Sequence, residues 1–236
     1  MITRGLLDQL LKSGSDMLQG GSASQGRTDH RQPLGKAAGS PLSGLLSGAG
    51  GGALGAGAIG LLLGSKKARK MGGKVITYGG LAALGVVAYK AYSNWQQNNG
   101  TEQQRQIEPR TVDRLPAAQA EEHSHAILRA VIGAAKADGH IDARERELID
   151  GEVAKLTQDP GLQRWFDQEL NKPLEPKDIA SSATTPEMAA EMYLASLLMV
   201  DEENFMERSY LEELARQLAL DPALKVELEK QARAAA

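Results

Sequence analysis

The chain has 236 residues, a net charge of −3 and no cysteine. This length accommodates one domain of ordinary size plus a membrane or linker region. The absence of cysteine excludes disulfides, thiol catalysis, thiolate metal sites and a lipoprotein anchor. Hydrophobic residues make up 42% of the chain and aromatic residues only 4%, which favours an all-α fold built on Ala and Leu.

Charge is distributed unevenly along the chain. Up to Lys74 the basic residues outnumber the acidic ones by seven, so the remainder carries a net charge of −10. A basic segment beside a membrane suits contact with anionic lipid headgroups. The acidic C-terminal part argues against nucleic acid as a partner.

Residues 1–36 divide into an amphipathic stretch and a linker. Leu6, Leu7, Leu10 and Leu11 recur at helical spacing, which predicts either a short interfacial helix or a frayed amphipathic tail. Asp8 interrupts the stretch, so it does not have the apolar core of a secretory signal. Residues 19–40 are rich in Gly, Ser and Gln without a period, which is typical of a linker.

A stripe of small residues follows within an uncharged run. Residues four apart lie nearly above one another on a helix, so small side chains at this spacing let a second helix approach closely. Such stripes are typical of helices that pack inside a bilayer. They predict self-association through a stripe formed by Gly44, Gly48, Gly52, Ala56, Gly60 and Gly64.

Residues 37–92 are therefore predicted to form a membrane region. Residues 37–65 carry no charge, a basic turn occupies 65–74, and 75–89 are again uncharged. The region forms either a hairpin of two spans or one span at 75–92. The basic turn is expected to face the cytoplasm, which puts the C-terminal domain in the periplasm.

Residues 93–118 are predicted to form a polar linker, and residues 119–236 a helical domain. Polar or acidic residues stand directly before proline at four points, as at the start of a helix, where proline fits the first position and the preceding side chain caps free amides. Apolar residues between these points recur at helical spacing. We expect six or seven helices, packed as an orthogonal bundle, with starts at Asp159-Pro160, Glu175-Pro176, Thr185-Pro186 and Asp221-Pro222.

Two acid-rich turns in this domain are the candidate sites. The first contains Asp138, Asp142 and Glu145, and the second contains Asp201 and Glu207. Carboxylate oxygens are the ligands that calcium prefers, so the two turns could converge on one divalent cation. The spacing between Asp142 and Glu145, like that of Asn204 and Glu207, also suits a helix cap. Neither turn has the spacing of an EF-hand loop, so capping and cation binding both stay open.

The chain resembles a known family in its order of segments and in two motifs. The motifs read AAKADGHIDARE and ENFMERSYLEELARQLAL, and they follow a Gly-rich segment, a basic turn and a second apolar segment. This order is similar to that of YebE-type bacterial inner membrane proteins. Their C-terminal domain resembles the TerB-like, tellurite-resistance-associated helical group. The resemblance implies an all-helical domain, a bacterial inner membrane location, no enzyme activity and a metal-binding turn at Asp138, Asp142 and Glu145.

We therefore expect a non-enzymatic membrane protein without a certain cofactor. Its C-terminal domain is expected to recognise a protein partner or to sense a cation such as calcium. Two alternatives remain: a purely structural envelope protein, and a hydrolase that uses paired carboxylates around His140. His123 and His125 are two apart, which points them to different faces of a helix and argues against zinc.

Overall fold

The structure is a computed structural model, and it describes residues 3–8, 73–102, 107–137, 141, 143–200 and 204–235. All regular elements among these residues are helices, and no strand occurs in the described ranges. This confirms the all-α prediction. A short helix at residues 3–8 is followed by α4 (Gly73–Asn99), α6 (Ala117–Ala135), α7 (Ala143–Leu156), α8 (Pro160–Asn171), α9 (Pro176–Ala180), α10 (Pro186–Met199), α11 (Phe205–Gln217) and α12 (Pro222–Ala235).

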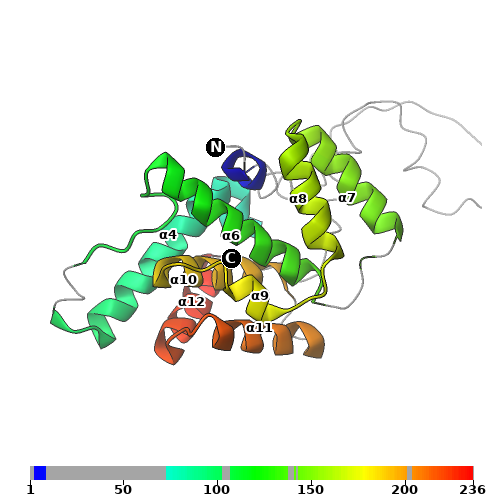
Figure 1. The fold of residues 1–236 in the computed structure, drawn as a ribbon. Coiled ribbons are helices and arrows are strands. Elements are labelled where there is room, and N and C mark those ends of the chain that lie inside the picture. The colour runs from blue at the N-terminus through cyan, green and yellow to red at the C-terminus, as the bar shows by residue number, and fades with distance from the viewer. Residues whose placement is uncertain are drawn as a thin grey trace, which may run out of the picture.

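Helix α10 is the centre of the bundle. Every residue from Met188 to Met199 is buried, including two polar ones, because α6, α4, α12 and α11 all pack against this helix. Figure 1 shows α10 in the middle of these helices. A helix that is apolar on all sides must be covered on all sides, so α10 becomes the core element and the amphipathic helices surround it.

Three of the four predicted caps are present. The Asp159 side chain accepts hydrogen bonds from the first turn of α8, Thr185 does the same for α10, and Asp221 for α12. Glu175, which precedes α9, makes no side-chain cap bond. Proline at the first helical position thus marks all four starts, and the shorter Asp and Thr side chains satisfy the free amides.

Helix α4 contains the second run that was predicted to lie in the membrane. Its backbone departs from helical geometry at Gly80 (φ 53°), and beyond that residue the helix packs against α12 and α10. Its buried side chains join the common hydrophobic core. No helix in the described part of the chain combines the length and hydropathy needed to cross a bilayer. The apolar face of this run is therefore accounted for by the bundle, through Leu81, Leu84, Ala88 and Ala91.

The membrane prediction otherwise falls on residues outside the described ranges. These include the whole of 37–72, and with it the stripe from Gly44 to Gly64 and most of the basic turn.

The predicted polar linker 93–118 includes the end of α4 and the first two residues of α6, and the described part between these helices lies against the bundle. Val112 is buried, and the Arg114 guanidinium stacks over the Tyr89 ring of α4 at 3.8 Å from the ring centroid. Thr111 donates a hydrogen bond from its hydroxyl to Asp113 at 2.6 Å. These contacts fix the start of α6 relative to α4.

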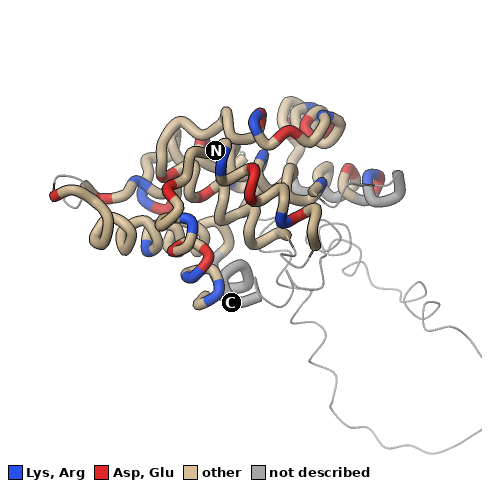
Figure 2. The backbone as a smooth tube through the Cα atoms, turned by 90° about the horizontal axis from the view of Figure 1, so that it is seen from below, with Lys and Arg blue, Asp and Glu red and all other residues tan. Residues whose placement is uncertain are grey.

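Helices α7 and α8 lie side by side at one end of the molecule (Figure 1). Helix α8 also contacts α6. Acidic and basic positions are interspersed along the helices in the view of Figure 2 rather than gathered by sign.

Candidate functional site

The structure describes only part of the predicted cation site. Asp138, Asp142 and Asp201 lie outside the described residues. Glu145 belongs to the first turn of α7, but its side chain is also outside what the structure describes. Glu207, in the first turn of α11, is described completely.

Glu207 takes part in the cap of α11. The Asn204 side-chain oxygen accepts a hydrogen bond from the Met206 amide at 2.9 Å, and the Asn204 side-chain amide donates to Glu207 Oε1 at 3.0 Å. Glu207 is only 7% exposed. The predicted helix cap at Asn204 is thus confirmed. No three His, Asp or Glu side chains are grouped for metal binding within the described ranges.

Helices α6 and α10, which precede the two acid-rich turns, run in the same direction. His123 and Glu191 are in contact near the start of this interface, and Ser196 donates to the Ala130 carbonyl oxygen further along both helices. The contact residues rise together in both helices, which identifies a parallel pair. The C-terminal ends of α6 and α10, at Ala135 and Met199, therefore point towards the same end of the molecule.

A buried polar centre connects this helix pair to the segment before α6. Glu191 Oε2 lies 2.5 Å from His123 Nδ1, and Glu191 Oε1 accepts a hydrogen bond from the Val112 amide at 2.6 Å. The Glu191 side chain is fully buried and that of His123 is 5% exposed. Burial raises the pKa of Glu191, although the hydrogen bond from His123 opposes this rise. Without access to solvent, the centre positions α6, α10 and Val112 relative to one another.

The sequence analysis missed this centre. Glu191 is the one acid in the otherwise uncharged stretch from Met188 to Met199, and that isolation was the available signal. A charged residue inside an apolar helix needs a partner when it is buried, so this isolated acid indicates a polar partner on another element. His123 could not be selected as the partner from spacing, because 68 residues separate the two.

The two histidines of α6 point to different neighbours, as predicted. His123 meets Glu191, whereas the His125 ring lies 4.1 Å from the Trp165 ring of α8, measured between centroids. Burial lowers the pKa of His125. The two rings therefore face different elements, α10 and α8. His140 lies outside the described residues.

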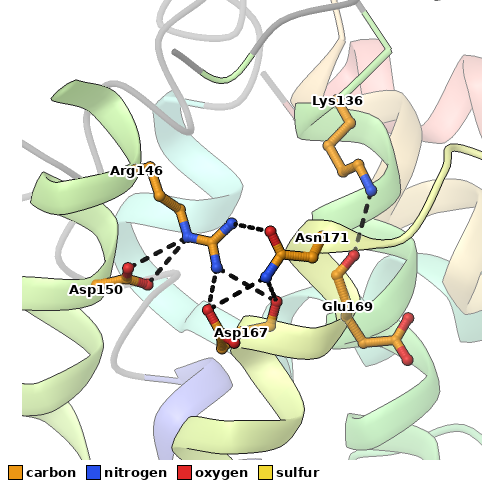
Figure 3. Close-up of polar contacts among 6 residues, drawn as sticks. All are labelled: Lys136, Arg146, Asp150, Asp167, Glu169 and Asn171. Atoms are coloured by element: carbon orange, nitrogen blue, oxygen red, sulfur yellow. Dashed lines mark hydrogen bonds and ion pairs between the residues drawn. The ribbon is translucent and has the colours of Figure 1, made fainter. Parts of the chain in front are cut away.

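Charged contacts fasten α8 to its neighbours on two sides. On one side Arg146 of α7 binds Asp150 within its own helix and both Asp167 and Asn171 of α8, as drawn in Figure 3. Its contact with Asn171 measures 3.0 Å.

On the other side of α8, Glu169 is shared by several cations. The Arg129 guanidinium of α6 lies 3.0 Å from the Glu169 carboxylate, which also pairs with Lys172. Lys136 donates to the Glu169 carbonyl oxygen at 3.2 Å (Figure 3) and to that of Lys172. A shallow cleft lies beside these residues, and Ile179 of α9 is one of the residues that line it. Its cations are occupied by carboxylate and carbonyl oxygens, so the arrangement fastens α6 to the end of α8.

Comparison with known proteins gives a family but no described activity. A family model described as a protein of unknown function, DUF533, matches residues 48–232. An uncharacterized protein in the ampR 5' region of Yersinia enterocolitica is 30% identical over 107 residues, which are 45% of this chain and 77% of that protein. No solved structure matches the chain. Since the family model covers the described helices from α4 to α11 and most of α12, the chain belongs to the DUF533 family.

Proposed function

We propose that this chain is a non-enzymatic protein whose helical bundle senses a divalent cation, with calcium as the first candidate, and is attached to a membrane. One observation carries the cation proposal. Helices α6 and α10 are parallel, and each is followed directly by one of the two acid-rich turns. The helix ends that precede the two turns therefore point towards the same end of the molecule, although the turns are more than 50 residues apart in sequence.

Electrostatics at that end favour a cation. The C-terminal end of a helix carries a partial negative charge, and two such ends point the same way here. Asp138 and Asp201 follow these ends in the sequence and add formal negative charge. Lys136, the nearest base on α6, directs its ammonium to carbonyl oxygens at the end of α8. A hard cation with oxygen ligands is the natural counterion for this arrangement.

A calcium titration of the full-length chain tests the proposal. We expect calcium to raise the melting temperature and to shift the backbone amide signals of Ala137 and Val200, the last described residues before the two turns. The double variant Asp138→Asn/Asp142→Asn is expected to lose both responses. The control Glu122→Gln/Glu187→Gln removes two charges from the first halves of α6 and α10 and is expected to keep them.

Unchanged melting and unchanged amide spectra of the wild-type chain at millimolar calcium would reject the cation proposal. The two turns would then serve as helix caps, as Asn204 does for α11, and the bundle would be a structural or partner-binding element. A response to magnesium equal to that to calcium would keep a cation site but remove the preference for calcium.

The proposed membrane attachment rests on residues 37–72. Their uncharged run, the stripe from Gly44 to Gly64 and the adjoining basic turn support a bilayer location with self-association. Because residues 3–8 and α4 pack into one bundle, we propose that residues 9–72 begin and end on the bundle's side of the membrane and that no crossing follows the basic turn. This revises the expected periplasmic location, which required a crossing at 75–92.

Fractionation after detergent-free lysis tests the attachment. The untagged chain is expected to sediment with the bacterial inner membrane and to need detergent for release. Recovery in the supernatant after ultracentrifugation contradicts the attachment and leaves the cation proposal untouched. Cleavage by protease added to sealed inside-out vesicles then shows whether the bundle and residues 66–74 are accessible from the same side of the membrane.

A further inference from the structure

The N-terminal residues 3–8 belong to the core of the bundle, although residues 9–72 separate them from α4 in the sequence. Leu6 is 2% exposed and Leu7 is fully buried. Both leucines are part of the same hydrophobic cluster as the core residues of α4 and α6. In Figure 1 this short helix lies beside α4 and α6. The sequence predicted an interfacial helix or a frayed tail here; the described residues 3–8 are helical, and Leu6 and Leu7 of this helix pack into the bundle.

Glu121 of α6 binds the beginning of this short helix. The Thr3 amide donates to Glu121 Oε1 at 2.6 Å, and the Arg4 amide donates to Glu121 Oε2 at 3.2 Å. Amides in the first turn of a helix have no partner within it, so a carboxylate from another element satisfies them. Burial acts to raise the pKa of Glu121, but the hydrogen bonds from Thr3 and Arg4 outweigh it and lower that pKa.

Asp8 makes the reciprocal contact at the other end of the segment. Helix α4 is interrupted at Gly80, whose φ of 53° is left-handed, so the helix begins anew at Leu81. The Leu81 amide donates to Asp8 Oδ1 at 3.3 Å. Each partner thus supplies a carboxylate to the free amides of the other, and this match of donors and acceptors is specific to the orientation of the segment.

We propose that the surface between Glu121 of α6 and Leu81 of α4, here termed the N-terminal docking surface, is a peptide-binding site. Its occupant is the segment Thr3–Asp8 of the same chain, acting as an intramolecular ligand. The surface recognises three features of the segment: the adjacent leucines Leu6 and Leu7, the backbone amides of the first helical turn, and the carboxylate of Asp8. Covalent attachment makes this binding intramolecular, so the segment docks without needing high affinity as a free peptide.

The absence of cysteine makes a site-specific probe straightforward. Gly5 is exposed, and a side chain built there meets no atom within 4 Å, so Gly5→Cys accepts a nitroxide label without disturbing the segment. In the labelled full-length chain we expect strong broadening of the Leu81 and Glu121 amide signals. Leu6→Ala/Leu7→Ala is expected to abolish this broadening, and Glu121→Ala to reduce it. Glu122→Gln, at the exposed neighbouring position, is expected to leave it unchanged.

A mixing experiment separates docking within one chain from docking between two copies. Unlabelled chains enriched in ¹⁵N are mixed with an equal amount of nitroxide-labelled chains of natural abundance. We expect no broadening in the mixture. Broadening of Leu81 there would overturn the proposal in favour of a segment exchanged between copies. Absence of broadening in the directly labelled wild-type chain would overturn docking altogether.

A synthetic peptide of residues 1–18, labelled at position 5, tests binding directly. Added to the unlabelled Leu6→Ala/Leu7→Ala chain, it is expected to broaden Leu81, because the docking surface is vacant. It is expected to have a several-fold smaller effect on the wild-type chain, where the surface is occupied. No broadening in the variant at millimolar peptide would overturn the peptide-binding site. If that variant fails to fold, the same comparison is made with Glu121→Ala, and equal peptide effects on it and the wild type would contradict the proposal.

Discussion

At the residue scale, Glu191 makes the free energy of unfolding depend on pH. It is fully buried, and its carboxylate is held between His123 and the Val112 amide. Because burial raises its pKa above the ordinary value of 4.5, the folded state retains a proton that the unfolded chain releases. The free energy of unfolding therefore falls as pH rises from about 4.5 through the raised pKa. Below pH 4.5 Glu191 is protonated in both the folded and the unfolded chain, so its titration does not lower the free energy of unfolding there.

Glu191→Gln removes the titration while keeping a hydrogen-bond acceptor for Val112. We expect the stability of the variant relative to the wild type to increase across this pH window, by about 1.4 kcal/mol for each unit by which the pKa is raised. Urea denaturation followed by circular dichroism at a series of pH values measures the difference. Glu187→Gln, one turn earlier on α10, is the control and should follow the wild type. Parallel curves for Glu191→Gln and the wild type would show that Glu191 does not titrate differently on folding.

At the element scale, helix caps decide where helices begin. Two acidic residues that each precede a helix-starting proline, Asp159 and Glu175, can be compared directly. Asp159 Oδ1 accepts hydrogen bonds from the Gly161 and Leu162 amides at 2.7 and 2.9 Å, whereas Glu175 caps nothing through its side chain. We expect Asp159→Ala to lower the free energy of unfolding by about 1 kcal/mol, because it leaves first-turn amides of α8 without a protein acceptor.

Glu175→Ala is the matched control for this change, since it also removes an acid before a helix-starting proline. We expect it to alter the free energy of unfolding by less than about 0.5 kcal/mol, the usual range for a surface substitution. Thermal and urea melts of the two variants make the comparison. Equal losses would mean that the side-chain cap bonds of Asp159 are not what separates the two positions.

At the scale of the whole molecule, the position of α4 determines how large the folding unit is. Leu84 of α4 is 2% exposed, and the helix packs on α10 and α12. If α4 folds with the bundle, Leu84→Ala lowers the stability of the entire bundle by about 2–5 kcal/mol, as expected for a buried leucine. Amide exchange in α10 and α12, together with urea denaturation, reports the change.

Val86 provides the control on the same helix, because it is 54% exposed. Val86→Ala is expected to change the stability by less than about 0.5 kcal/mol. A bundle whose exchange rates are unaffected by Leu84→Ala would indicate that α4 is dispensable for its stability. That outcome would favour a location of residues 75–92 in the membrane.

Periodicity and local chemistry were sufficient to predict the helices of the C-terminal domain. Asp159, Thr185 and Asp221 act on amides only two or three residues away, so spacing alone identifies their function. The cap at Asn204 was predictable for the same reason. The apolar residues 75–92 show the limit of this reasoning, because an uncharged run has the same composition whether lipid or other helices cover it.

By itself, then, the sequence determined the all-α class, the helix starts and the acid-rich turn capped by Asn204, because these depend on contacts within a few residues. Only the tertiary structure decided that α4 joins the bundle, that Glu191 meets His123, and that Leu6 and Leu7 enter the core. Glu191 and His123 are 68 residues apart, and Thr3 and Glu121 are 118 apart. Such pairs form only when the packing of several helices brings them together, and no local pattern encodes that packing.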